Sequence, residues 1–188
     1  MSLEGLTAMS LEGSQKAPLA IGVDLGGTKI AAGLFNASGA LIGSLAVAPT
    51  EAEGPGEKTK ENLLAVIERA AAGCSDRSGC SDRSRIAGIG VGSTGPLDPV
   101  SGTLLEADSL PNLFHFPLRE AIERRFGGPV LITNDGNAFA LAEALHGAGR
   151  GHSIVVGITL GTGCGCGIVI REKILEGATA NTGELYRA

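Results

Sequence analysis

Residues 24–29 (DLGGTK) follow the first apolar run of the chain and have the composition of a phosphate-binding turn. Glycine lets a backbone approach a phosphate closely, the N–H groups of such a turn can donate to its oxygens, and Asp24 can hold Mg²⁺ through water. An ordinary hairpin is the alternative, since Gly-Gly is also a common two-residue turn. The P-loop motif G-x-x-x-x-G-K-[ST] occurs nowhere in the chain.

A second glycine-rich turn is predicted at residues 160–167 (LGTGCGCG), between two β-branched runs. Its glycines at alternate positions leave one side of the backbone bare, as a turn that surrounds a polyphosphate requires. Cys164 and Cys166 raise the alternative of a metal site, but two sulfurs without a third ligand nearby make a poor zinc site. Buried, small apolar cysteines are the favoured interpretation.

Residues 133–138 (TNDGNA) stand where a short strand passes into a helix. Asp135 is expected at the helix N-terminus, where the dipole keeps a carboxylate ionised. There it could accept a proton from a substrate hydroxyl, and strand ends at this edge of an α/β sheet are where ligands collect. The alternative is a simple N-cap, a role that Asn and Asp both favour.

The segment at residues 90–95 (GVGSTG) matches the dinucleotide fingerprint G-x-G-x-x-G. A Rossmann turn has to open a helix, whereas the next four residues, 96–99 (PLDP), force an extended or turning chain. The match is therefore rejected, and with it a nicotinamide enzyme.

The apolar periodicity predicts an α/β chain in the order βββ-α-β-α-β-α-ββ, with helices packed on a mixed sheet. The helix at 134–145 is expected to turn Ala138, Leu141 and Leu145 inward. Strands are predicted at 19–24, 30–35, 41–48, 86–92, 130–133, 154–160 and 167–170, and helices at 57–72, 118–126 and 134–145.

Composition bounds the class of protein. The chain has 188 residues, 43% of them apolar and 19% charged, with a net charge of -5, which is typical of a globular protein. The acidic balance argues against nucleic acid or an anionic membrane as the main partner. The uncharged stretch at 153–170 holds five glycines, which favours two strands over a membrane helix. Four cysteines without a preceding secretory signal indicate reduced thiols and a cytoplasmic protein.

Two short duplications occur in the chain: MSLEG at 1–5 and 9–13, and GCSDRS at 73–78 and 79–84. We expect residues 1–17 to be disordered or tag-like. The second duplication is expected in a surface loop, where insertions are tolerated.

Four segments together resemble the ROK proteins (repressors, open reading frames and sugar kinases), and bacterial ROK glucokinases in particular. They read IGVDLGGTKI, GVGSTGPLD, ITNDGNAFALAEALHGAGRG and ITLGTGCGCGIVI, in the family's order and spacing. The resemblance runs from about Pro18 to Glu184. It implies the actin-like ATPase fold, with residues 18–133 as a first ribonuclease-H-like domain and 134–188 as the start of a second, incomplete one.

The resemblance also implies the activity: transfer of the ATP γ-phosphate, with Mg²⁺, to the 6-hydroxyl of a hexose, glucose above all, by a cytoplasmic homodimer. Asp135 would be the catalytic base. Sugar-binding residues would be Asn112, Asn134, Asp135 and Glu184. Phosphate-binding residues would be Asp24, which also holds Mg²⁺, with Gly26, Gly27, Thr28, Lys29, Gly161, Thr162 and Gly163.

The chain departs from the family pattern after Glu184. ROK kinases continue Gly-Glu-x-Gly-His, with a His that contacts sugar and zinc, whereas Arg187 stands at that position and no zinc site is expected. The sequence resembles the front half of such a kinase, so an inactive fragment is one interpretation, and too few residues precede the first strand for a helix-turn-helix. A non-catalytic sugar-binding or regulatory ROK protein is the alternative, although the two phosphate turns and Asp135 together favour the enzyme.

Overall fold

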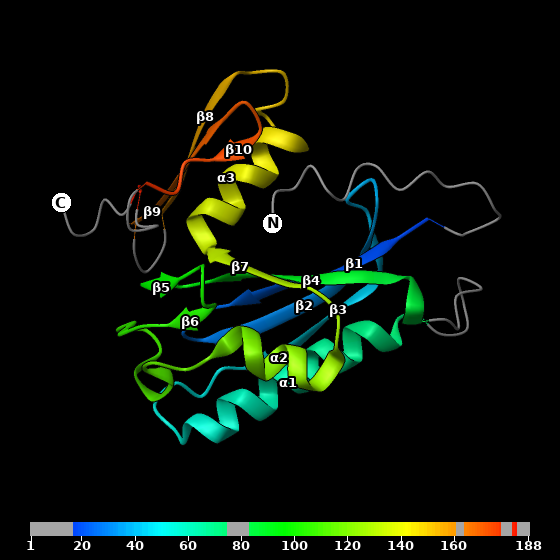
Figure 1. The fold of residues 1–188 in the computed structure, drawn as a ribbon, viewed down its shortest axis with the longest axis vertical. Helices are drawn as coiled ribbons and strands as arrows, with labels where there is room; N and C mark the ends of the chain where they lie inside the picture. The colour runs from blue at the N-terminus through cyan, green and yellow to red at the C-terminus, as the bar shows by residue number, and fades with distance from the viewer. Residues whose placement is uncertain (1–16, 75–82, 161–163, 178–181, 184–188) are drawn as a thin grey trace.

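The computed structural model describes residues 17–74, 83–160, 164–177 and 182–183. A five-stranded mixed sheet, in the order β3-β2-β1-β4-β7, forms its larger part (Figure 1). An antiparallel meander supplies β1 (Leu19–Leu25), β2 (Lys29–Asn36) and β3 (Leu41–Pro49). Next to β1, β4 (Ile86–Ser93) and then β7 (Val130–Asn134) are added in parallel.

Helices α1 (Gly56–Ala72) and α2 (Leu118–Phe126) cover one face of this sheet (Figure 1). Leu63, Val66 and Ile67 of α1 are completely buried because they recur at helical spacing on the face that meets the sheet. Leu118 and Ile122 of α2 are likewise completely buried. Gly127, at φ 68, ends α2 where an L-residue would be strained.

A second sheet, in the order β10-β9-β8, lies beyond α3 (Asp135–Leu145) (Figure 1). Its strands are β8 (Ile154–Leu160), β9 (Cys164–Ile170) and β10 (Lys173–Ile174). The first two are antiparallel neighbours, with Leu160 opposite Cys164, so the uncharged stretch consists of two strands, as predicted. No helix among the described residues is long and apolar enough to cross a membrane.

The predicted order of long elements is confirmed, with boundaries that differ by at most three residues. The short elements were not predicted, because two or three residues carry no periodicity. These are β5 (Leu97–Asp98), β6 (Thr103–Leu104), η2 (Arg83–Arg85) and η3 (Pro111–Leu113), as well as β10.

The predicted inward face of α3 is wrong for Leu145, whereas Ala138 is partly buried and Leu141 packs against the small apolar cluster beside the second sheet. Asn137, Ala140 and Ala144 are buried, whereas Leu145 is exposed. Small residues face the strands because α3 packs close to glycines of β8 and β9: a Cβ added at Gly157 would lie 2.9 Å from the Cβ of Ala140. The prediction instead directed Leu145 inward as well.

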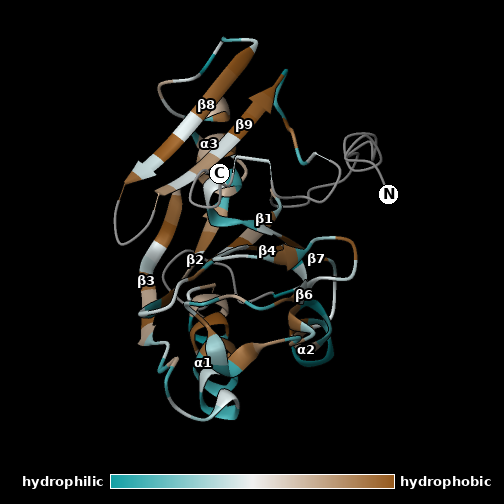
Figure 2. Ribbon diagram, turned by 90° about the vertical axis from the view of Figure 1, so that its left-hand side faces the viewer, coloured by the Kyte–Doolittle hydropathy of each residue, from teal (hydrophilic) through white to brown (hydrophobic). Residues whose placement is uncertain are grey.

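One face of β8 exposes a row of apolar side chains: Ile154 (62%), Val156 (54%), Ile158 (53%) and Leu160 (83%). The strand pairs with β9 on one side, and no described strand pairs with the other. Figure 2 shows the strongly apolar character of this hairpin. An uncharged, apolar edge strand promotes association between molecules.

We therefore expect the chain to self-associate with rising concentration, as sedimentation velocity can measure. Ile158→Lys should shift the sedimentation distribution towards monomer, because association through β8 would then bury a charged lysine side chain, which is costly. Val100→Lys is the matched control, since Val100 is 85% exposed in a turn away from β8. A monomer at every concentration, or equal effects of both variants, would contradict the expectation.

Candidate functional site

The parallel register of three strands gathers polar side chains at one edge of the larger sheet. Asp24 at the end of β1 is aligned with Gly92 of β4, and Gly92 with Thr133 of β7. One step further, Ser93 is aligned with Asn134. Carboxyl ends of parallel strands are where α/β sheets bind ligands, and the predicted phosphate turn and the predicted base lie at the same edge of the sheet.

The turn after β1 is closed by a hydrogen bond from the Gly26 N–H to the Lys29 carbonyl (3.1 Å). The expectation that every N–H of this turn is free is therefore wrong for Gly26. The turn does join two antiparallel strands, as in the hairpin alternative, and Thr28 and Lys29 are exposed. Hairpin geometry and phosphate binding are compatible here.

Gly27 brings this turn against the segment before η3. A Cβ added to Gly27 would lie 2.6 Å from the Ser109 carbonyl oxygen, so only glycine fits. The Ser109 hydroxyl is 2.9 Å from that of Thr94, which follows β4. An open cavity of about 660 Å³ lies beside this contact, large enough for part of a small ligand. Its lining residues are Gly27, Thr28, Glu51, Ala52, Glu53, Gly54, Asp108 and Ser109.

At the start of α3, Asn134 is the N-cap. Its Oδ1 accepts a hydrogen bond from the Gly136 N–H (2.8 Å), and Oδ1 of Asp135 accepts from the same N–H (2.8 Å). The capping alternative is thus confirmed for Asn134. Capping also fixes the first turn of α3, which holds the Asp135 carboxylate at the strand edge.

Loss of solvation raises the pKa of the Asp135 carboxyl group above its ordinary value, although the residue as a whole is exposed. The Gly136 N–H acts in the opposite direction, and the negative charge of Asp24 raises the pKa further. Among these influences the loss of solvation is the largest. A raised pKa suits a general base, whose affinity for a proton must be appreciable.

Glycines allow α3 to pack closely against β4 and β9. A Cβ at Gly92 of β4 would lie 3.2 Å from the Cβ of Ala138, and one at Gly136 would lie 3.0 Å from the backbone of Cys166. Gly92 belongs to the rejected dinucleotide fingerprint. No helix follows that segment, because β4 ends at Ser93 and β5 comes next, so the rejection is confirmed and the glycine serves packing. Cys166 is a buried free thiol, as predicted, whereas Cys164 is a free thiol that is only half-buried.

Asn112 lies in η3 with its amide turned into the chain. Its Nδ2 is 3.1 Å from the Glu51 carbonyl, 3.0 Å from the Gly54 carbonyl and 2.8 Å from the Thr59 hydroxyl. Its Oδ1 is buried without a hydrogen-bond partner. The amide thus fastens the segment after β3, a role that the sequence did not reveal.

Several predicted site residues lie outside the described part of the chain. They are Gly161, Thr162, Gly163 and Glu184, and Arg187, at the position of the family's His, also lies outside it.

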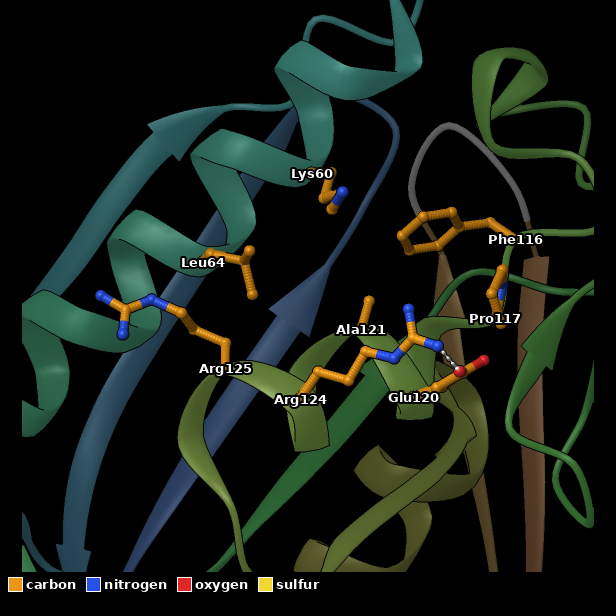
Figure 3. A pocket seen from close by; sticks show the side chains of 8 residues that line it. All are labelled: Lys60, Leu64, Phe116, Pro117, Glu120, Ala121, Arg124 and Arg125. Carbon is orange, nitrogen blue, oxygen red and sulfur yellow. Dashed lines mark ion pairs between the residues drawn. The ribbon is translucent and has the colours of Figure 1, made fainter.

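A second hollow, of about 330 Å³, lies between α1 and α2 (Figure 3). Leu64, Phe116 and Ala121 give it an apolar floor, and Arg124 at its rim pairs with Glu120. Because α1 and α2 cover a face of the sheet, this hollow is separate from the strand edge that carries Asp24 and Asp135. It contributes nothing to the candidate site.

The donor set at the strand edge fits Mg²⁺. That ion is usually held by one or two carboxylates together with substrate phosphates, rather than by a complete cage of protein ligands. Asp24 and Asp135 supply two carboxylates near enough to interact through their charges. Within the described ranges, no group of three or more His, Cys, Asp and Glu residues lies together to form such a cage.

The charge coupling between the two carboxylates can be tested without a ligand. We expect Asp24→Asn to lower the pKa of Asp135, because it removes a negative charge that disfavours ionisation. Carboxyl ¹³C NMR titration would measure it. Asp98, whose pKa is lowered by a hydrogen bond from Ser101, is the internal control and should not move. An unchanged Asp135 would show that the two groups do not face one another.

Comparison with known proteins identifies the family of the chain. Residues 20–185 match the model of the ROK family. A glucokinase of Streptomyces coelicolor is 38% identical over 159 residues, which are 85% of this chain and 46% of that protein. A protein named as a xylose repressor in Caldicellulosiruptor is 36% identical, over 96% of this chain and 44% of its own. The chain thus spans about half the length of the curated relatives it matches.

A solved structure, the ROK family glucokinase of Streptomyces griseus in complex with glucose and AMPPNP, superposes with a TM-score of 0.75. It is 36% identical, and the match covers 88% of this chain and 49% of that one. The α/β architecture with its mixed sheet is that of the actin-like ATPase fold, as expected. With a family match over nearly its whole length, the chain belongs to the ROK family.

Proposed function

We propose that this chain carries the phosphate-binding turn and the catalytic base of an ATP-dependent hexose kinase of the glucokinase type. The observation that carries the proposal is the meeting of Asp24 and Asp135 at one strand edge, beside the glycine turn. Kinship with the glucokinases supports it, and AMPPNP in the Streptomyces griseus structure supports ATP as the phosphate donor.

In this proposal one group of residues binds the phosphate donor ATP, and another binds the sugar that accepts the phosphate. The first turn (Gly26, Gly27, Thr28, Lys29) and the second (Gly161, Thr162, Gly163) would bind the ATP phosphates, with Asp24 directed to Mg²⁺. When bound, Mg²⁺ would neutralise phosphate charge. Asp135 would accept the proton of the sugar 6-hydroxyl as that oxygen attacks the γ-phosphorus, and its raised pKa supports this role.

The remaining ring hydroxyls would be bound by Asn134 and Glu184, with Asn112 included on the strength of the family pattern alone. Capping fixes the orientation of Asn134 and so supports its part. Glucose is the proposed hexose and a cytoplasmic homodimer the proposed form of the protein.

The second candidate is a sugar-binding regulator without catalysis, favoured by kinship with the xylose repressor. Such a protein needs a sugar site but has no use for a general base.

A coupled assay of hexose-dependent ADP release, together with calorimetric titration of glucose and of ATP with Mg²⁺, separates the two. A kinase binds both ligands and releases ADP only when the hexose is present, with glucose preferred over N-acetylglucosamine and mannose. Sugar binding without ATP binding would support the regulator and overturn the kinase proposal.

A further inference from the structure

Thr50, directly after β3, is completely buried and directs both of its hydrogen-bond donors to the candidate phosphate turn. Its hydroxyl Oγ1 donates to the Gly26 carbonyl (2.6 Å), and its backbone N–H donates to the Thr28 carbonyl (3.0 Å). One residue, 24 positions away in sequence, therefore fastens the turn at two points.

Because the peptide bond is planar, the hydrogen bond from Thr50 to the Gly26 carbonyl also affects the neighbouring N–H group. The carbonyl of Gly26 and the N–H of Gly27 belong to one rigid trans peptide and point in opposite directions. When Thr50 holds the carbonyl, it also fixes the direction of the Gly27 N–H. Gly27 lines the 660 Å³ cavity beside the turn, so the fixed peptide belongs to the wall of the candidate site.

A second layer of hydrogen bonds holds Thr50 itself. Thr59, completely buried in the first turns of α1, donates from Oγ1 to the Thr50 carbonyl (2.8 Å). The Thr59 hydroxyl in turn lies 2.8 Å from Nδ2 of Asn112. Between Thr50 and Thr59 the chain passes through Glu51, whose φ is 58°. This backbone conformation persists only where the surrounding structure holds it.

We propose that Thr50 is a positioning residue for phosphate binding, which aims the Gly27 N–H at the nucleotide, and that Thr59 and Asn112 support it. The inference rests on the proposed function, since it assigns the turn to a nucleotide phosphate. Loss of the buried hydroxyl would leave the Gly26 carbonyl without this donor and free the peptide to rotate.

Two variants separate the hydroxyl from the shape of the side chain. Thr50→Val keeps the shape and removes the donor, whereas Thr50→Ser keeps the donor and is the matched control. Amide hydrogen exchange of Gly26, measured by NMR without ligand, reports the turn directly. We expect exchange at least fivefold faster in Thr50→Val, near-native exchange in Thr50→Ser, and no change in β4 or β7 of either variant.

Calorimetric titration of AMPPNP with Mg²⁺ and of glucose reports the functional consequence. Thr50→Val should weaken AMPPNP binding about tenfold and leave glucose binding within about twofold, and Thr50→Ser should restore the nucleotide affinity. Unchanged exchange at Gly26, or equal losses for both ligands, would overturn the inference. Failure of the unmodified chain to bind AMPPNP would instead overturn the proposed function and the inference with it, so the two failures are distinguishable.

Discussion

Asp135→Asn should lower hexose-dependent ADP release by about 10²–10⁴-fold, the usual contribution of a general base. The amide keeps the size of the side chain and an oxygen that can accept the Gly136 N–H, but it cannot take up a proton. Glucose affinity should therefore stay within about tenfold of the native value. Coupled turnover assays and sugar titrations would measure the two quantities separately.

Folding of this variant is not expected to suffer at neutral pH. Because the pKa of Asp135 is raised in the folded state, its contribution to stability is present below the unfolded pKa and is lost as pH rises through the folded pKa. At pH 7 the neutral amide thus removes a carboxylate that the fold disfavours, and Tm should be unchanged or higher.

Glu143→Gln is the matched control on the same helix. Glu143 accepts a hydrogen bond from the Ala148 N–H (2.9 Å) at the other end of α3, and glutamine can still accept it. Its turnover should remain native. If Asp135→Asn also kept its turnover, Asp135 would not be the base.

Local patterns predicted the strands and the strand-end location of the site. Asp24 and Asp135 were expected at the ends of buried strands, and the alignment of β1, β4 and β7 brings those ends together. The domain division near residue 134 stays a prediction. The buried apolar residues form two clusters, one of residues between Leu19 and Ile132 and another around Ala140, Ala144 and Val169.

Contacts between distant segments could not be predicted in this way. Thr50 looks like an ordinary loop residue in the sequence, and its bond to Gly26 depends on where the end of β3 lies beside the turn. The internal role of Asn112 depends likewise on the packing of η3 against the start of α1. The position of Leu145 on α3 was misjudged because hydropathy ranks Leu above Ala, whereas the narrow space between α3 and the strands favours small side chains such as Ala140 and Ala144.

Gly167→Ala should destabilise the fold by about 1–3 kcal/mol, the usual cost of overpacking. Gly167 of β9 faces α3: an added Cβ would overlap the Gly136 carbonyl oxygen and lie 2.8 Å from both the Cα of Asn137 and the Cβ of Ala140. Two of these neighbours are backbone atoms, which cannot rotate away. For a chain of this length the loss corresponds to a Tm lower by roughly 2–12 °C, measured by thermal unfolding.

Gly90→Ala is the matched control, because Gly90 also lies within a strand and an added Cβ would meet nothing within 4 Å. It should be neutral or slightly stabilising, since alanine reduces the conformational freedom of the unfolded chain. The two variants together test whether glycine is needed for close approach of α3 rather than for strand flexibility.

Because Gly167 meets the first turns of α3, its added methyl group should also displace Asp135, and ADP release should fall in Gly167→Ala but not in Gly90→Ala. Equal Tm values for both variants would show that β9 does not fix the position of the helix.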